Sequence, residues 1–119
     1  MVQGDFTING GGKAAELLMN RHPDVDGIFI GNDLMALGAM KKLQQKGIRI
    51  PDQVAICGFD GIHLTMITEP EMTTIAQPIY EIGMLATRLL IKKIEGMAEE
   101  NQIHEFDVTL IPRGSTERK

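Results

Sequence analysis

The 119 residues of this chain, 43% hydrophobic and 24% charged, suffice for one domain or part of one and exclude disordered and fibrous classes of protein. A formal net charge of −4 argues against a nucleic-acid-binding surface within the chain, because contact with a phosphate backbone needs clustered Lys and Arg. The single cysteine, Cys57, excludes an intrachain disulfide, and its apolar surroundings predict a buried, unreactive side chain. No apolar run is long enough to span a membrane and no signal-peptide pattern is present, so we expect a cytoplasmic protein.

The first helix is expected behind a glycine-rich loop. Residues 4–12 are rich in turn-forming residues, and the apolar pattern becomes helical only over residues 13–21. The loop is not a P-loop for nucleoside triphosphates, because that motif requires Gly where Thr7 stands and Ser or Thr where Ala14 stands. Pro23 then ends the helix, since proline disfavours helical geometry in the residue before it.

The stretch from Asp26 to Asp60 predicts a βαβ unit. Residues 27–30 are apolar throughout, which is typical of a strand buried on both faces of a parallel sheet. A helix follows, with apolar residues at helical spacing, and Gly47 ends it. Residues 54–58 predict the second strand.

Two polar residues follow these strands, Asn32 after the first and Asp60 after the second. Because the strands of a βαβ unit are parallel, both residues should emerge at one edge of the sheet, where open α/β sheets bind ligands. Simpler interpretations remain for each residue alone: Asn32 or Asp33 as the cap of the helix, and Asp60 as a turn residue. The pair favours a ligand-binding cleft more than either residue does singly.

The rest of the chain predicts a helical turn, a strand, a helix and an edge strand, at residues 63–67, 72–76, 79–94 and 103–112. The helix at 79–94 is apolar over much of its circumference, so we expect it to be buried on more than one side, against the rest of the chain or another chain. The polar tail, residues 113–119, is expected to fray. Strands that alternate with helices predict the α/β fold class.

Patterns typical of enzymes and metal sites are absent from the sequence. The three histidines are scattered, with no second ligand at helical or turn spacing, which argues against a zinc site. No nucleophile elbow or Cys-His constellation is present. Asp33 and Asp60 could form an acid and base pair, yet nothing supplies a nucleophile or a pKa-shifting partner. We therefore expect no catalytic residues, no metal site and no cofactor.

Several motifs together indicate a family. In chain order they are IFIGNDLMALGAMKKLQQKGIRIPDQVAICGFD, PEMTTIAQP, EIGMLATRLL and PRGST. In order and spacing they closely resemble the C-terminal part of LacI/GalR-family transcriptional repressors, over residues 4–116. Repressors of this family look like periplasmic sugar-binding proteins joined to an N-terminal helix-turn-helix domain, and ligand state changes their affinity for operator DNA.

The resemblance implies a three-layer parallel-sheet sandwich of the type I periplasmic-binding-protein-like class. Residues 1–77 and 111–119 would form the C-terminal effector-binding subdomain, and residues 78–110 would belong to the N-terminal subdomain. The chain would cross the hinge between them twice, near Gln77-Pro78 and near Leu110-Pro112. The rest of the N-terminal subdomain and the DNA-binding domain would lie outside this sequence.

The resemblance also implies a site. Asn32 of the N-D-x-x-A-x-G motif and Asp60 of the G-F-D motif match residues that commonly hydrogen-bond effector hydroxyls in the family. A carboxylate accepts two hydroxyl protons, and an amide both donates and accepts, which suits a sugar or related metabolite. Asp33 matches a residue that looks structural in the family, and Gly61 departs from the family, which often has Asp there.

The function implied is that of an effector sensor in a homodimeric repressor, which would bind operator DNA through the absent domain and have no contact with a membrane. The alternative is part of a periplasmic sugar-binding protein of a transport system. An upstream helix-turn-helix in the parent gene would select the repressor, and an upstream signal peptide would select the transport protein.

Overall fold

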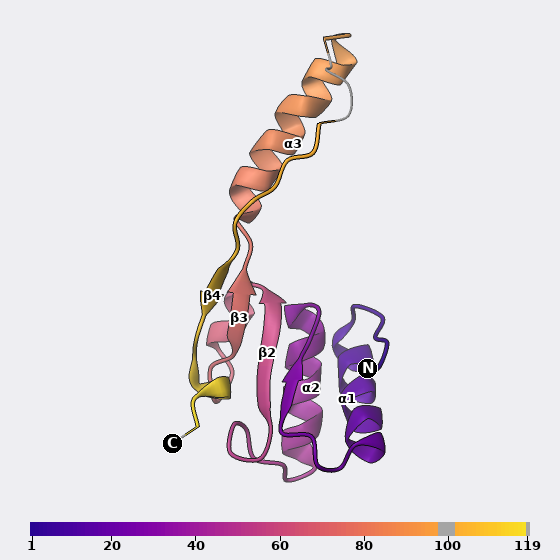
Figure 1. Ribbon diagram of the computed structural model, residues 1–119, viewed down its shortest axis with the longest axis vertical. Helices are drawn as coiled ribbons and strands as arrows, with labels where there is room; N and C mark the ends of the chain where they lie inside the picture. Colours follow the sequence, from indigo (N-terminus) through magenta and orange to yellow (C-terminus); the bar gives the residue numbers. More distant parts are fainter. Residues whose placement is uncertain (98–101, 119) are drawn as a thin grey trace. The chain divides into compact units, whose positions relative to one another are not determined.

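A computed structural model describes residues 1–97 and 102–118 of the chain (Figure 1). Its elements are α1 (Ile8–Arg21), β1 (Gly27–Phe29), α2 (Asp33–Gln45), β2 (Ala55–Asp60), η1 (His63–Met66), β3 (Thr73–Ala76), α3 (Ile79–Ile94), β4 (Thr109–Ile111) and η2 (Gly114–Thr116). The short elements η1 and η2 are 3-10 helices. The chain divides into two units, one of Met1–Ala76 with Leu110–Lys119 and one of Gln77–Thr109.

A sheet forms the centre of the first unit. In the part of the chain that the structure describes it has four strands, in the order β1-β2-β3-β4. The first three strands are parallel, with Phe29 opposite Cys57 and Asp60 opposite Ala76. Since α2 connects β1 to β2, the predicted βαβ unit and the α/β class are both confirmed.

Helix α1 begins earlier than the sequence predicts, and the glycines expected in a loop lie inside it. The hydroxyl of Thr7 accepts a hydrogen bond of 2.9 Å from the amide of Gly10 and caps the helix. Gly11 lies against the backbone of Met35 in α2, and Gly38 of α2 lies as close to the backbone of α1. A side chain at either glycine would collide with the neighbouring helix. Glycine weakens an isolated helix, but here it lets α1 and α2 lie side by side (Figure 1).

The hydrophobic core lies mainly between α2 and β2. The buried apolar residues are Ala15, Ala36, Ala39, Met40, Leu43, Ile50, Val54, Ile56 and Met72. Full burial of a Leu, Ile or Met side chain contributes about 1.5–3 kcal/mol, so these contacts dominate the stability of the unit. They also fix where α2 begins and where β2 ends, which are the two places that carry the polar pair.

Strand β1 is less buried than the sequence predicts. Its Phe29 side chain is 63% exposed, and Ile28 is half-buried. Side chains alternate between the two faces of a strand. Ile56 and Gly58 of β2 are buried, and Gly58 lies next to Ala36 of α2, whereas Cys57 between them is half-buried. The described residues therefore supply the sheet and one layer of helices, and the expectation that β1 is buried on both faces is wrong within them.

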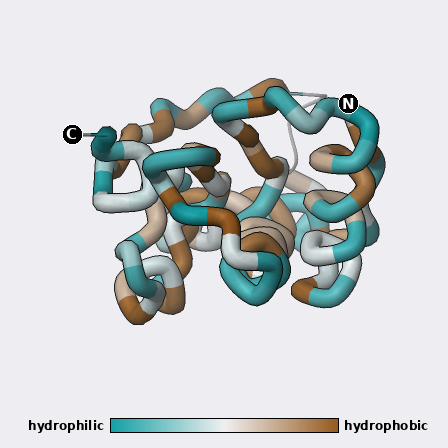
Figure 2. The backbone as a smooth tube through the Cα atoms, turned by 90° about the horizontal axis from the view of Figure 1, so that it is seen from below, coloured by the Kyte–Doolittle hydropathy of each residue, from teal (hydrophilic) through white to brown (hydrophobic). Residues whose placement is uncertain are grey.

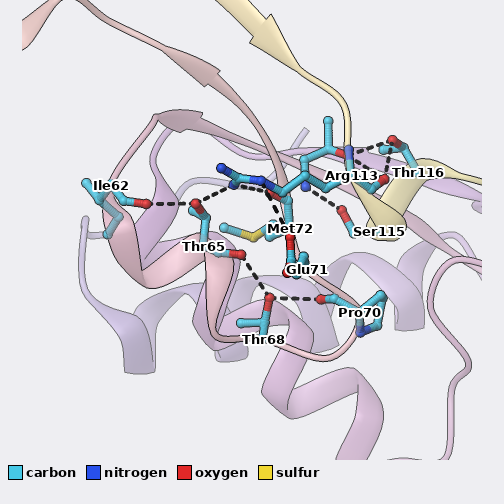
Figure 3. A network of polar contacts seen from close by, with 10 residues as sticks. Ile62, Thr65, Thr68, Pro70, Glu71, Met72, Arg113, Ser115 and Thr116 are labelled. Carbon is cyan, nitrogen blue, oxygen red and sulfur yellow. Dashed lines mark hydrogen bonds and ion pairs between the residues drawn. The ribbon is translucent and has the colours of Figure 1, made fainter.

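The polar tail is anchored, which contradicts the expectation that it frays. The hydroxyl of Ser115 is fully buried, donates to the carbonyl of Ile56 at 2.6 Å and accepts from the amide of Thr73 at 2.8 Å. The guanidinium of Arg113 donates to the hydroxyl of Thr65 and to the carbonyl of Met72 (Figure 3). The tail thus holds β2, β3 and η1 together through hydrogen bonds, which its polar composition did not predict.

The second unit contains the strongest predicted helix, and α3 has the predicted bounds of residues 79–94. Among the described residues of this unit, none buries α3, and Tyr80 and Ile94 are 80% and 76% exposed. The expectation that α3 packs on other parts of the protein or on another chain stays a prediction. Strand β4 is shorter than the predicted 103–112, because only Thr109–Ile111 joins the sheet.

Hydropathy is distributed in short alternating stretches along the backbone (Figure 2). Among the helices of residues 1–97 and 102–118, none is long and apolar enough to cross a membrane.

Replacement of Ser115 by alanine tests the tail anchor. The variant leaves the carbonyl of Ile56 and the amide of Thr73 without their partner, so the free energy of unfolding should fall by about 1–3 kcal/mol. Urea unfolding followed by circular dichroism measures the change. Glu117→Ala, an exposed residue just after η2, is the control and should stay within about 0.5 kcal/mol of the parent chain. A Ser115→Ala variant as stable as this control would contradict the anchor.

Candidate functional site

The carboxyl ends of β1 and β2 lie at one edge of the sheet. The two strands are parallel, with Phe29 opposite Cys57. Asn32 follows β1 after a two-residue connection, and Asp60 is the last residue of β2. Both side chains are half-buried. The structure therefore places the two predicted site residues at the same edge, each partly open to solvent.

Asn32 caps helix α2. Its Oδ1 accepts a hydrogen bond of 2.8 Å from the amide of Met35, and its extended backbone, with φ of −152°, is typical of an N-cap residue. The capping interpretation of the sequence is thus confirmed for Asn32. No hydrogen bond joins its Nδ2 to another residue that the structure describes, so two N–H donors remain for a ligand.

Asp33 is the polar centre of this edge. Its side chain is fully buried, and Oδ2 accepts from the amides of Gly61 and Ile62 at 2.8 and 2.9 Å. Oδ1 accepts from the hydroxyl of Thr74 at 2.7 Å. A buried carboxylate is costly unless it is hydrogen-bonded, and these three donors offset that cost. Asp33 thereby links α2, β3 and the loop after β2.

Two glycines at the end of β2, Gly58 in the strand and Gly61 just after it, lie close to the side chain of Asp33. Gly58 lies directly under the carboxylate, and a Cβ there would collide with Oδ1 of Asp33. Gly61 has a φ of +85°, which glycine adopts without penalty. The spacing of these glycines in the sequence CGFDG therefore serves the approach of Asp33 to the strand end.

Asp60 has a strained backbone. Its φ is +131°, in a region that residues with a side chain rarely adopt and that costs on the order of 1–3 kcal/mol. The conformation persists because Asp33 holds the amides of the next two residues. Such strain concentrates at binding and catalytic sites, and whether Asp60 contacts a ligand stays a prediction.

Phe6, in the turn before α1, is a further exposed residue that the sequence did not single out. Its side chain is 70% exposed and its φ is +63°. Oδ1 of Asp5 accepts hydrogen bonds from the amide and the hydroxyl of Thr7, at 3.0 and 2.7 Å. These bonds close a turn in which Phe6 is the central residue. Nearby Gly4 lies against Met35 in the first turn of α2. The signal that could have found Phe6 is a lone aromatic residue inside a run of turn-forming residues.

Cys57 and Asp5 both have pKa values displaced from their ordinary values. Burial raises the pKa of the Cys57 thiol above its usual value, and the negative charge of Asp33 raises it further, so the thiol stays protonated near neutral pH. Hydrogen bonds from Thr7 lower the pKa of Asp5. Within residues 1–97 and 102–118 no group of three His, Cys, Asp or Glu side chains is placed to hold a metal ion.

Comparison with known protein families gives a match over nearly the whole chain. Residues 2–116 match the family described as periplasmic binding protein-like domain. The chain belongs to this family. With it, the type I periplasmic-binding-protein-like fold class predicted from the sequence is confirmed.

Known relatives of this periplasmic binding protein-like domain are LacI-type regulators. The chain is 43% identical over 116 residues to the ribose operon repressor of Halalkalibacterium halodurans, covering 98% of this chain and 35% of that protein. A LacI-type transcription regulator from Bifidobacterium animalis subsp. lactis has a TM-score of 0.89 at 36% identity, covering 98% of this chain and 42% of that structure. A LacI family regulator from Enterococcus faecium, solved with bound ribose, has a TM-score of 0.84 at 31% identity, covering 97% and 42%. The predicted resemblance to the LacI/GalR family is confirmed, and the chain spans about a third of the ribose repressor's length.

Removal of the Asp33 carboxylate tests whether its hydrogen bonds stabilise this edge of the sheet. Asp33→Ala leaves the amides of Gly61 and Ile62 and the hydroxyl of Thr74 without an acceptor, so the free energy of unfolding should fall by about 3 kcal/mol. Chemical denaturation measures the change. The exposed Asp52→Ala is the control and should change stability by no more than about 0.5 kcal/mol. Equal stability of the two variants would show that Asp33 does not hold the edge.

The pKa of Asp5 tests the turn that presents Phe6. The hydroxyl of Thr7 contributes most to holding this pKa below its ordinary value of 3.8. Because the folded pKa is depressed, the stabilising contribution is complete above pH 3.8 and is lost as the pH falls through the folded pKa. In an NMR titration of the Asp5 carboxyl carbon, Thr7→Val should move the midpoint up toward 3.8, whereas Thr7→Ser should keep it low. An unchanged midpoint in Thr7→Val would contradict the hydrogen bond between the Thr7 hydroxyl and Asp5 that closes the turn.

Proposed function

We propose that this chain is the C-terminal part of the effector-sensing domain of a LacI-type repressor, and that Asn32 and Asp60 hydrogen-bond a small sugar or related metabolite. The observation that carries the proposal is the edge built around Asp33, where Asp60 is held in a strained conformation. Asn32 offers two N–H donors at the same edge. This is the place where open α/β sheets bind ligands.

The chemistry of the edge suits a polyol. The carboxylate of Asp60 accepts hydroxyl protons, while the Nδ2 of Asn32 donates to hydroxyl oxygens. The exposed ring of Phe6 supplies an apolar surface against which a sugar ring can lie. The relative solved with bound ribose supports a sugar as the class of ligand.

Regulation follows from differential binding. A ligand that contacts the carboxyl edge of this sheet and the remainder of the effector domain stabilises one arrangement of the repressor over the other. Its difference in affinity for the two arrangements sets the change in operator binding, which in known systems amounts to about 1–3 kcal/mol. DNA itself is bound through a domain outside this chain, in keeping with the formal charge of −4.

We assign residues 1–77 and 111–119 to the C-terminal subdomain and residues 78–110 to the N-terminal subdomain, as the family resemblance implies. The division of the structure into two units supports this assignment. The relatives named as repressors and transcription regulators favour a cytoplasmic regulator without catalysis over a periplasmic transport protein.

The repressor acts as a homodimer, and the loop after β2 supplies part of the contact. Leu64, Met66 and Ile67 in and after η1 are 45%, 47% and 77% exposed. Clustered apolar side chains on a surface mark interaction sites, and two-fold homodimers are the commonest oligomers. Sedimentation velocity of the full-length protein tests this part: a dimer that Ile67→Asp dissociates supports it, and a monomer contradicts it.

Calorimetry on the full-length parent protein tests the site, after a thermal-shift screen of pentoses, hexoses, phosphosugars and purines has identified the ligand. Asp60→Ala should weaken binding by about 1–3 kcal/mol, or about 5- to 150-fold, through loss of a polar contact. Unchanged affinity in this variant would remove Asp60 from the site.

Asn32 needs a matched pair of variants because it also caps α2. Asn32→Ala removes both the cap and the amide, whereas Asn32→Ser retains a capping oxygen and removes the amide donors. Both variants should lose affinity, and only Asn32→Ala should also lose about 1 kcal/mol of stability. Full affinity in Asn32→Ser would show that Asn32 is a cap alone.

A further inference from the structure

Gly61, directly after Asp60, makes an unusually close approach to β3. A Cβ built on Gly61 would lie 2.7 Å from Cβ and 2.8 Å from Cα of Ala76, both shorter than real Cβ contacts. The φ of Gly61 is +85°, so a side chain there would be strained even without the neighbour. The backbone of the strand end therefore lies against Ala76, and in this chain a side chain at position 61 would force one of the two segments to shift.

Ala76 is the last residue of β3 and lies opposite Asp60 in the sheet register. The next residue, Gln77, begins the second unit of the chain. Ala76, where the chain leaves the sheet, is thus an immediate neighbour of both Asp60 and Gly61.

The loop after β2 has little freedom to move away from Ala76. Asp33 accepts from the amides of Gly61 and Ile62, at 2.8 and 2.9 Å, from the side of α2. Closely packed groups transmit small displacements because no void absorbs them. A displacement of Asp60 is therefore passed to Ala76 rather than lost within the loop.

We propose that Gly61 is a positioning residue that couples Asp60 to the crossing between Ala76 and Gln77. It sets the direction of the Asp60 carboxylate and transmits a ligand's pull on Asp60 through Ala76 to Gln77, the next residue of the chain. The inference rests on the proposed function for its ligand, and on the contact between Gly61 and Ala76 for its geometry.

The test uses NMR of the isotope-labelled chain, with the carboxyl carbon of Asp60 and the amide of Gln77 as reporters. Gly61→Ala should shift both signals. Gly47→Ala is the matched control, because Gly47 has a similar φ of +79° but open space around it, and it should shift neither. Adding Ala76→Gly to Gly61→Ala removes the contact with Cβ of Ala76 but leaves the one with Cα, so both signals should move only part of the way back.

A second variant covers the case in which Gly61→Ala does not fold. Ala76→Val enlarges the same contact from β3 without changing the backbone of Gly61, and it should shift the Asp60 carboxyl carbon. Reporters that respond to Gly61→Ala no more than to Gly47→Ala, or an Asp60 signal unmoved by Ala76→Val, would overturn the proposal.

Binding of D-ribose by the full-length protein separates this inference from the proposed function. If ribose binds, Gly61→Ala should weaken it by about tenfold, with Gly47→Ala unchanged. Equal affinities in these two variants would overturn the coupling. If neither ribose nor any compound of the thermal-shift screen binds, the proposed ligand class fails, and the two NMR reporters alone decide whether Gly61 positions Asp60.

Discussion

One buried carboxylate organises the edge of the sheet that carries the polar pair. Asp33 receives hydrogen bonds from Gly61, Ile62 and Thr74, which belong to the loop after β2 and to β3. It stands at the start of α2, so the helix, the loop and the strand share one anchor. Hydrogen bonds to a buried charge are among the strongest in proteins, and their loss would leave donors unpaired.

The strained backbone of Asp60 depends on this anchor. A residue at φ of +131° would relax if the following loop were free, and the two amides held by Asp33 prevent that relaxation. The anchor in turn depends on the core between α2 and β2 and on Gly58, which leaves room for the carboxylate. The hydroxyl of Ser115 ties β2 to β3 from the tail, so the two strands keep their alignment.

Features that arise from local sequence patterns could be predicted. Helix α3 has the predicted bounds because its apolar spacing is regular, and the strand ends at Asn32 and Asp60 were found because parallel strands present them at one edge. The family resemblance indicated a structural role for Asp33, but its three partners lie 28 to 41 residues away, beyond the reach of any local pattern.

Features that depend on tertiary contacts were missed. Three successive glycines indicate a loop, yet they lie in α1 because α2 requires a close approach there. The polar tail predicted a frayed end, but Arg113 and Ser115 find partners on β2, β3 and η1. The exposure of Phe29 follows from which sheet face the described helices cover, and an apolar run by itself does not specify that.

Amide hydrogen exchange at Gly61 and Ile62 tests the central claim most directly. If Asp33 holds the loop, these two amides exchange as slowly as those of β2, although they lie outside the strand and are only half-buried. Exchange at the rate of an unstructured loop would contradict the account, because Asp33 would then not hold the loop that follows Asp60.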